Sequence, residues 1–282
     1  MVHQQMASQE ITVAYLGPAG SYTHQAALGK FGNSVTYHPQ ATIDDVFKFV
    51  EEKHTTYGVV PFENSTFGSV VTTLDRLVSS KTQIIGEAYL EVNHNLLAKS
   101  NIKSVKRIYS HPQAFGQCRK WINTHLKGAQ CIDASSTSRA AELAASESAS
   151  AAISSIVCAE LYGLNVLEKD IQDLRGNKTR FFILGNSPSG STGDDRTLLL
   201  FTVDHRKPGA LCDCLKTFKD HNINLTKIDS RPSLQRQWNY VFFVEFEGHK
   251  DDSNVRMSLN DIGEYCLGLT VLGSYSNKRT ED

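Results

Sequence analysis

Short apolar runs alternate with amphipathic stretches from Ile11 to Gly185. Runs of four to seven apolar or β-branched residues predict buried strands, and apolar positions recurring three or four residues apart predict helices. The strand runs are 11–17, 35–38, 57–62, 83–98, 107–111, 129–133, 151–155 and 179–185, and the helical stretches are 21–32, 44–54, 69–80, 113–126, 138–148 and 157–163. Strands that alternate with helices predict an α/β fold built on a parallel sheet with helices on both faces.

The pattern changes after a stretch rich in Gly, Ser, Pro and Asp that runs from Gly185 to Asp195, which is linker composition. Beyond it the order is strand 196–204, helix 209–222, strands 225–232 and 239–249, helix 255–266 and strand 269–275. That order, βαββαβ, is typical of the ferredoxin-like fold. The chain is therefore expected to have a catalytic or binding region followed by a smaller domain.

Composition excludes several classes of protein. The 282 residues are enough for two domains, and a net charge of −1 gives no bulk reason to bind nucleic acid or a membrane surface. No run of 18 apolar residues exists, and the first ten residues, expected to be a leader, lack an apolar signal-peptide core, so we expect a cytoplasmic protein. The six cysteines form no C-x-x-C pair, which favours reduced thiols over disulfides and predicts no metal site.

Hydroxyl and amide side chains gather at the turns between a strand and the following helix. These turns carry Gly20 and Ser21, Asn64 and Ser65, Ser110, and Ser136 and Thr137. Each polar residue alone is explained as a helix N-cap. Together they lie where ligands bind in open α/β sheets, beside free N–H groups of helix N-termini, and so predict a site for a small anion. The glycine turn GPAGS matches neither a Walker A loop nor GxGxxG.

A threonine and an arginine stand at the start of the buried strand 179–185. Thr179 can donate one hydrogen bond, and the planar fork of Arg180 can bind a carboxylate. A plainer interpretation pairs Arg180 with Asp170 or Asp173, just upstream. Another candidate acid is His111, which precedes a proline and is expected to pack under a helix. Glu63 is a further candidate, but as a carboxylate in the first turn it can instead interact favourably with a helix dipole.

With these residues assembled, the chain resembles the prephenate dehydratase family. The motifs that carry the resemblance are LGPAGSYTHQAA, VVPFENSTFGSV, YSHPQAFGQC, SSTSRAAE and NKTRFFILG, followed by GAL at 209–211 and DSRP at 229–232, which resemble the phenylalanine-binding motifs of an ACT domain. Two departures are Ser21-Tyr22-Thr23 in place of Thr-Phe-Ser and Asp229 in place of Glu. No helical chorismate mutase segment precedes residue 11, which suggests the monofunctional form.

The resemblance implies a two-lobed, periplasmic-binding-protein-like α/β catalytic region at 11–185, with a second lobe at about 93–164. A linker at 186–195 and a ferredoxin-like ACT domain at 196–275 follow. It implies the conversion of prephenate to phenylpyruvate, water and CO2 without a cofactor, with L-phenylalanine as allosteric inhibitor of a homodimer or a dimer of dimers. Alternatives are an arogenate dehydratase and a non-catalytic module that binds small anions.

The resemblance also assigns residues to roles. The catalytic positions are Thr179 as hydrogen-bond donor to the departing oxygen, Arg180 as carboxylate ligand and Phe181 as apolar surround. The substrate-binding positions are Gly20, Ser21, Asn64, Ser65, Ser110, Gln117, Ser136 and Thr137. The phenylalanine-binding positions are Gly209, Ala210, Leu211, Ser230, Arg231 and Pro232.

Overall fold

The computed structural model describes residues 10–233 and 239–279. The chain divides into two compact units: unit 1 comprises Met1–Val46, Val59–Ser69 and Tyr89–Phe181, and unit 2 comprises Phe47–Gly58, Val70–Ala88 and Phe182–Asp282. The leader expected at the N-terminus lies outside the described residues. Among the described helices, none is long and apolar enough to cross a membrane.

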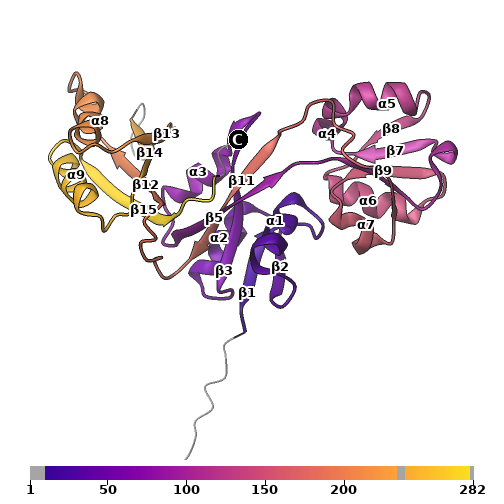
Figure 1. The fold of residues 1–282 in the computed structure, drawn as a ribbon, viewed down its shortest axis with the longest axis horizontal. Helices are drawn as coiled ribbons and strands as arrows, with labels where there is room; N and C mark the ends of the chain where they lie inside the picture. Colours follow the sequence, from indigo (N-terminus) through magenta and orange to yellow (C-terminus); the bar gives the residue numbers. More distant parts are fainter. Residues whose placement is uncertain (1–9, 234–238, 280–282) are drawn as a thin grey trace, which may run out of the picture. The chain divides into compact units, whose positions relative to one another are not determined.

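The first sheet follows the predicted alternation of strands and helices (Figure 1). Its strand order is β2-β1-β3-β11-β5, with β4 paired to β3. The strands are β1 (Thr12–Leu16), β2 (Thr36–Gln40), β3 (Tyr57–Asn64), β4 (Gly68–Ser69), β5 (Gln83–Glu91) and β11 (Lys178–Gly185). The helices between them are α1 (Tyr22–Phe31), α2 (Ile43–Glu51) and α3 (Val71–Leu77). Strands β1 and β2 are parallel, whereas β3 and β4 form an antiparallel hairpin.

The second sheet has the order β10-β6-β9-β7-β8. Its strands are β6 (Asn95–Ala98), β7 (Arg107–Ser110), β8 (Gln130–Asp133), β9 (Ser150–Ser154) and β10 (Asn165–Glu168). Its helices are η1 (Ile102–Ser104), α4 (Pro112–Gln117), α5 (Arg119–His125), α6 (Thr137–Ser146) and α7 (Val157–Tyr162). The expected parallel sheet is only partly present here: β7 runs parallel to β8 and β9, whereas β6 runs antiparallel to β9 and β10. Apolar periodicity carries no strand direction, so the sequence could not reveal this.

Two expected elements divide in the structure. The strand run 83–98 becomes β5 and β6, which belong to different sheets and are separated by Val92–His94. The helix expected over 113–126 becomes α4 and α5, because the backbone of Cys118 leaves the helical region at φ −116° and ψ 13°. Apolar spacing continues through both interruptions, and tertiary packing decides where each element ends.

The C-terminal strands and helices form the predicted βαββαβ fold. The elements are β12 (Asp195–Thr202), α8 (Ala210–Asp220), β13 (Leu225–Pro232), β14 (Tyr240–Glu247), α9 (Ser253–Gly263) and β15 (Gly268–Ser276). The sheet has the order β13-β14-β12-β15, with antiparallel neighbours. Both helices pack on one face, where the rings of Phe218 and Phe246 lie 5.1 Å apart.

Strand β15 also packs against β5, within unit 2. A Cβ on Gly273 would overlap the carbonyl group of Ile84, so glycine permits this close approach. The rings of Tyr275 and Phe182 lie 5.5 Å apart, and the backbone N–H of Lys278 donates to the Glu87 carboxylate at 2.6 Å. The C-terminal fold is therefore packed against part of the first sheet's secondary structure.

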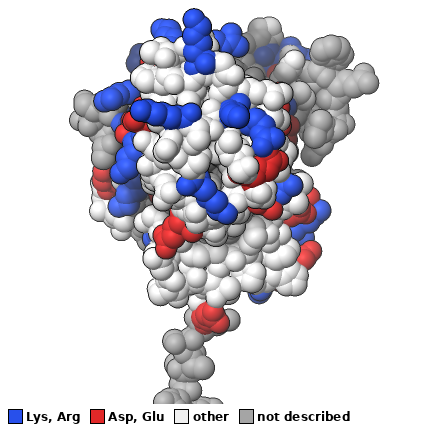
Figure 2. Space-filling model, turned by 90° about the vertical axis from the view of Figure 1, so that its right-hand side faces the viewer, with Lys and Arg blue, Asp and Glu red and all other residues white. Residues whose placement is uncertain are grey.

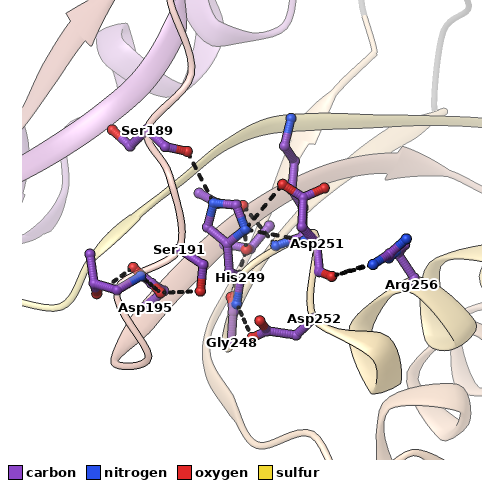
Figure 3. A network of polar contacts seen from close by, with 12 residues as sticks. Ser189, Ser191, Asp195, Gly248, His249, Asp251, Asp252 and Arg256 are labelled. Carbon is purple, nitrogen blue, oxygen red and sulfur yellow. Dashed lines mark hydrogen bonds and ion pairs between the residues drawn. The ribbon is translucent and has the colours of Figure 1, made fainter.

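A buried histidine holds the stretch that sequence composition marks as a linker. His249, fully buried, donates through Nε2 to the carbonyl oxygen of Ser189 at 3.1 Å, and its Nδ1 accepts from the N–H of Asp251 at 3.2 Å (Figure 3). Asp195 accepts hydrogen bonds from the N–H groups of Thr192 and Gly193 at 2.7 and 3.1 Å. These bonds fix the course of residues 189–195 beside β12.

Charged side chains are mixed on the face seen in Figure 2, where Lys and Arg are spread among uncharged residues with acidic ones between several of them. Ion pairs on the second sheet's helices and strands join Arg139 to Glu142 at 2.6 Å and Arg107 to Glu147 at 3.2 Å. All six cysteines are free thiols, as the sequence predicted.

Candidate functional site

The hydroxyl group of Thr179 is oriented by Asn64. Asn64 ends β3, and its Oδ1 accepts from the backbone N–H groups of Thr66 and Phe67 at 2.9 and 3.0 Å. Because those groups only donate, the Asn64 amide nitrogen must face the other way, where it donates to Thr179 Oγ1 at 2.9 Å and to Asn177 Oδ1 at 2.6 Å. The Thr179 oxygen is therefore an acceptor for Asn64, which leaves its own proton to be donated elsewhere.

Ser65 fixes the start of β11 beside this pair. Its backbone N–H donates to the carbonyl oxygen of Lys178 at 2.8 Å, and its Oγ accepts from the N–H of Lys178 at 2.9 Å. The same Oγ donates to the carbonyl oxygen of Gly176 at 3.3 Å. Ser65 therefore holds the backbone on the N-terminal side of Thr179.

Arg180 is buried on the other face of the strand. It is 5% exposed, its Nη1 lies 3.7 Å from Glu63 Oε2, and its guanidinium lies 5.3 Å from the Phe62 ring centroid. Successive side chains of a strand point to opposite faces, so Asn64–Thr179 and Glu63–Arg180 are pairs on opposite faces. The plainer interpretation expected Asp170 or Asp173 as the partner of Arg180, but the structure pairs Arg180 with Glu63. Asp173 instead accepts hydrogen bonds from the N–H groups of Lys120 and Trp121.

Phe181 is 1% exposed and belongs to the apolar core. Strand alternation puts it on the same face as Thr179, one pleat further into the sheet. In this structure the ring supports the strand beneath Thr179.

The glycine turn is joined to helices of the second sheet, within unit 1. Gly20 has φ +83°, and a Cβ there would lie 2.6 Å from the thiol of Cys158. The carbonyl oxygen of Gly20 accepts from Ser155 Oγ at 2.6 Å and from Cys158 Sγ at 3.3 Å, and Ser138 Oγ donates to the carbonyl oxygen of Ala19. Glycine is required here both by the left-handed backbone and by the close approach.

Ser21, Ser136, Ser110 and His111 have partners nearby in the structure. Ser21 caps α1 by accepting from the N–H of His24 at 3.2 Å, and Ser136 caps α6 by accepting from the N–H of Arg139 at 3.0 Å. Thr137 begins α6. Ser110 is fully buried and donates to the carbonyl oxygen of Ile153 at 2.8 Å. Its hydroxyl proton is therefore used in a hydrogen bond between β7 and β9 in this structure. His111 caps α4 through Nδ1, which accepts from the N–H of Gln113 at 3.2 Å.

Gln117, at the end of α4, is bonded to a buried histidine that sequence reasoning did not single out. His94 Nε2 lies 2.5 Å from Gln117 Oε1, and His94 Nδ1 lies 2.7 Å from the hydroxyl of Tyr22. Burial lowers the pKa of His94, an effect that its hydrogen bond to Gln117 opposes, and burial raises the pKa of Tyr22 well above its usual value.

The structure thus groups the candidates into three sets within unit 1. One joins Asn64, Ser65 and Thr179 at the ends of β3 and β11; one joins the Gly20 turn to Ser138 and Ser155; and one joins Tyr22, His94 and Gln117. Ser21 and Tyr22 are adjacent in the chain, which links the second and third sets. The one sequence signal for His94 was a histidine between two asparagines within the strand run 83–98. Among the described residues, no group of three or more His, Cys, Asp or Glu could hold a metal ion.

The candidate phenylalanine-binding residues lie on two faces of the C-terminal sheet. Gly209, with φ +82°, precedes α8; Ala210 is buried in the helix-side core and Leu211 packs against it. In β13, Ser230 and Pro232 are exposed and alternate with Arg231, which binds Asp75 of α3. Since neighbouring strand residues point to opposite faces, Ser230 and Arg231 cannot line one side of the sheet together.

Family models match most of the chain. A model described as prephenate dehydratase matches residues 13–189, and a model described as ACT domain matches residues 197–264. The chain is 45% identical over 268 residues to a bifunctional chorismate mutase/prephenate dehydratase of Aquifex aeolicus, a match that covers 95% of this chain and 74% of that protein.

Two further relatives bear on substrate and ligand. Arogenate dehydratase 2 of Petunia hybrida is 35% identical over 286 residues, covering 94% of this chain and 71% of the relative. A solved structure of a prephenate dehydratase from Arthrobacter aurescens in complex with L-Phe is similar with a TM-score of 0.86 and 32% identity, covering 95% of this chain and 90% of that one.

Proposed function

The chain belongs to the prephenate dehydratase family, and we propose that it removes the ring carboxylate of prephenate as CO2 and its C4 hydroxyl as water, yielding phenylpyruvate. Aromatisation drives this reaction, and the protein must supply binding, orientation and help for a poor leaving group. The observation that carries the proposal is the hydrogen bond from Asn64 to Thr179, because it leaves the threonine proton available at the mouth of β11.

Thr179 donates a hydrogen bond to the C4 oxygen as that oxygen departs. A threonine hydroxyl is far too weak an acid for ordinary general-acid catalysis at neutral pH. Its contribution is therefore stabilisation of the charge that develops on the oxygen in the transition state, with the proton of the leaving water supplied by solvent. Asn64 makes this donation possible by filling the lone pair of Thr179 that faces the protein.

Arg180 acts from beneath the site. The sequence suggests a direct ligand for a substrate carboxylate, but a guanidinium that is 5% exposed and already paired with Glu63 has little surface to offer. Its proposed role is to hold the end of β3, through the ion pair with Glu63, so that Asn64 stays in place. Phe181 supports Thr179 from the core in the same way.

The substrate carboxylates are assigned to helix N-termini. Helices α1 and α6 follow the N-cap residues Ser21 and Ser136, and the first N–H groups of a helix have no partner within it. Gln117 supplies an amide donor for a substrate oxygen.

L-phenylalanine is proposed as an inhibitor that binds the ACT domain near Gly209 and Ser230. The match to the ACT family model and the L-Phe complex of the Arthrobacter relative support this assignment. A homodimer or a dimer of dimers and a cytoplasmic location are further proposals, and the predicted domain boundaries at 185 and 196 stay predictions.

A single assay tests the reaction. Purified protein is added to prephenate, and phenylpyruvate is followed by its absorbance in alkali; a parallel reaction with arogenate is followed by the phenylalanine it yields. We expect faster turnover with prephenate. A larger kcat/KM with arogenate would assign the chain to the activity of the Petunia relative. No turnover of either substrate would leave the alternative of a binding module.

A further inference from the structure

His94 occupies the middle of a buried polar chain that ends at a proposed substrate ligand. The residue is 3% exposed and lies between β5 and β6, where the chain passes from the first sheet to the second. Its Nδ1 is 2.7 Å from the Tyr22 hydroxyl and its Nε2 is 2.5 Å from Gln117 Oε1. The ring therefore joins α1 to α4 through both of its nitrogens.

The backbone around His94 is held independently of its ring. The N–H of His94 donates to Gln172 Oε1 at 2.9 Å, and Gln172 Nε2 donates to Asn93 Oδ1 at 2.7 Å. The Tyr22 and His94 rings also meet edge to face, with centroids 5.8 Å apart. A side chain fixed at its backbone, its ring face and both nitrogens has one orientation.

The hydrogen bonds determine which nitrogen carries the proton. An amide oxygen only accepts, so His94 Nε2 must be the N–H that donates to Gln117 Oε1. The Nδ1 lone pair then faces the Tyr22 hydroxyl at 2.7 Å, and that hydroxyl also donates to the carbonyl oxygen of Asn93 at 3.1 Å. In this tautomer the oxygen end of the Gln117 amide faces His94.

We propose that His94 is a positioning residue that binds the Gln117 amide oxygen and so presents the Gln117 NH2 group to an oxygen of the substrate. The proposal rests on the proposed function, in which Gln117 contacts the substrate. Without His94 to hold its oxygen, the Gln117 amide could rotate and present that oxygen to an anionic substrate, which would repel it. His94 removes that possibility without touching the substrate.

Two substitutions of His94 distinguish the contributions of its two ring nitrogens. In His94→Gln, the amide nitrogen can occupy the place of Nε2 and donate to Gln117. In His94→Asn, the shorter amide reaches only the place of Nδ1, so the contact with Tyr22 stays and the contact with Gln117 is lost. We expect kcat/KM to fall roughly tenfold in His94→Asn, the usual scale for one hydrogen bond, and at most about threefold in His94→Gln. His125→Asn, in an exposed histidine of α5, is the matched control and should leave kcat/KM unchanged.

A double-mutant cycle with Gln117→Ala tests whether His94 acts through Gln117. If it does, Gln117→Ala and His94→Asn alter kcat and KM in the same proportions, and adding His94→Asn to Gln117→Ala costs less than about twofold. Effects that multiply in the double variant would overturn the proposal, as would full activity of either single variant. Tyr22→Phe, which removes only the hydroxyl, should also lose its effect in the Gln117→Ala background, and provides the test if the His94 variants do not fold.

The outcomes separate this inference from the proposed function. Absence of wild-type activity on prephenate and arogenate contradicts the proposed function. A wild-type enzyme that is active, with Gln117→Ala impaired and His94→Asn unimpaired, contradicts the positioning role alone.

Discussion

Arg231 of β13 binds Asp75 of α3 in a bidentate ion pair, with Nε 2.6 Å from Oδ1 and Nη2 3.0 Å from Oδ2. Both residues belong to unit 2, and 156 positions separate them in the chain. Helix α3 follows directly after the turn and hairpin that carry Asn64 and Ser65. The arginine of the DSRP motif is thus bound to a helix of the catalytic region, on the face of β13 opposite to Ser230.

This pair is a candidate for the link between phenylalanine binding and catalysis. Asp75→Asn keeps the shape of the side chain and removes its charge, so we expect a basal kcat within about twofold of wild type. The phenylalanine concentration for half inhibition should rise at least about fivefold, the lower end of typical allosteric couplings. Because partly exposed ion pairs contribute only about 0–1 kcal/mol to stability, the Tm should change little.

The control for this variant is Asp220→Asn, which removes an exposed partner of Lys216 on α8. It should leave both activity and inhibition unchanged. A phenylalanine response of Asp75→Asn identical to that of wild type would show that the Arg231 pair has no part in regulation.

Thr179→Val removes the proposed transition-state donor and keeps the side-chain shape. We expect kcat to fall by roughly 10²–10³, the usual loss for one such donor, with little change in KM. Thr179→Ser retains the hydroxyl and should keep much of the rate. Steady-state kinetics on prephenate measure both, and normal turnover of the valine variant would refute the role.

Gly209→Val should weaken phenylalanine inhibition while sparing the basal rate. Valine at φ +82° is strained whatever the space around it, and a branched side chain would cover the start of α8. Gly193, with φ +89° and likewise open surroundings, offers the matched control. Gly193→Val should lower the Tm by a similar amount, but phenylalanine should inhibit this variant as it inhibits wild type. Loss of phenylalanine inhibition in both variants would indicate general strain in the domain.

Asp195 makes stability depend on pH. Burial by itself would raise the pKa of Asp195, but hydrogen bonds from Thr192 and Gly193 and the nearby His249 lower it overall. A carboxyl with a lowered folded-state pKa stabilises the protein above its unfolded-state pKa of about 4, and that stability is lost as pH falls through the lower folded-state value.

Asp195→Asn should therefore lower the Tm at pH 7, by the equivalent of about 1–3 kcal/mol for mismatched buried hydrogen bonds. Its Tm should also fall less steeply than that of wild type as pH drops below about 4. Thermal melts across this range measure both effects. An unchanged pH slope would mean that Asp195 is not the group that titrates.

The packing of β15 on β5 changes how regulation should be tested. Linker composition suggests that the ACT domain can be removed by truncation near Pro188. Deleting β15 would uncover the backbone of Ile84, which Gly273 approaches closely, and would leave Asp75 without Arg231. Point substitutions therefore give a cleaner answer than truncation does.

Sequence alone determined the features that depend on neighbours along the chain. Apolar spacing located nearly every helix and strand, and the capping roles of Ser21 and Ser136 follow from hydrogen bonds that span three residues. Gly20 was recognised in a turn and Gly209 through the GAL motif, and both adopt the positive φ that glycine allows. The motifs around Thr179 identified the family for the same reason: they are short and contiguous.

Tertiary structure decided the partners that lie far apart in the chain. Asn64 and Thr179 are 115 residues apart, Tyr22 and His94 are 72 apart, and His94 and Gln117 are 23 apart. Which of several carboxylates pairs with Arg180, and which face of β13 carries Arg231, depend on strand order and on which elements pack together. Local propensity contains neither, because a hydrogen bond between distant residues forms only where the whole fold brings its two atoms within about 3 Å.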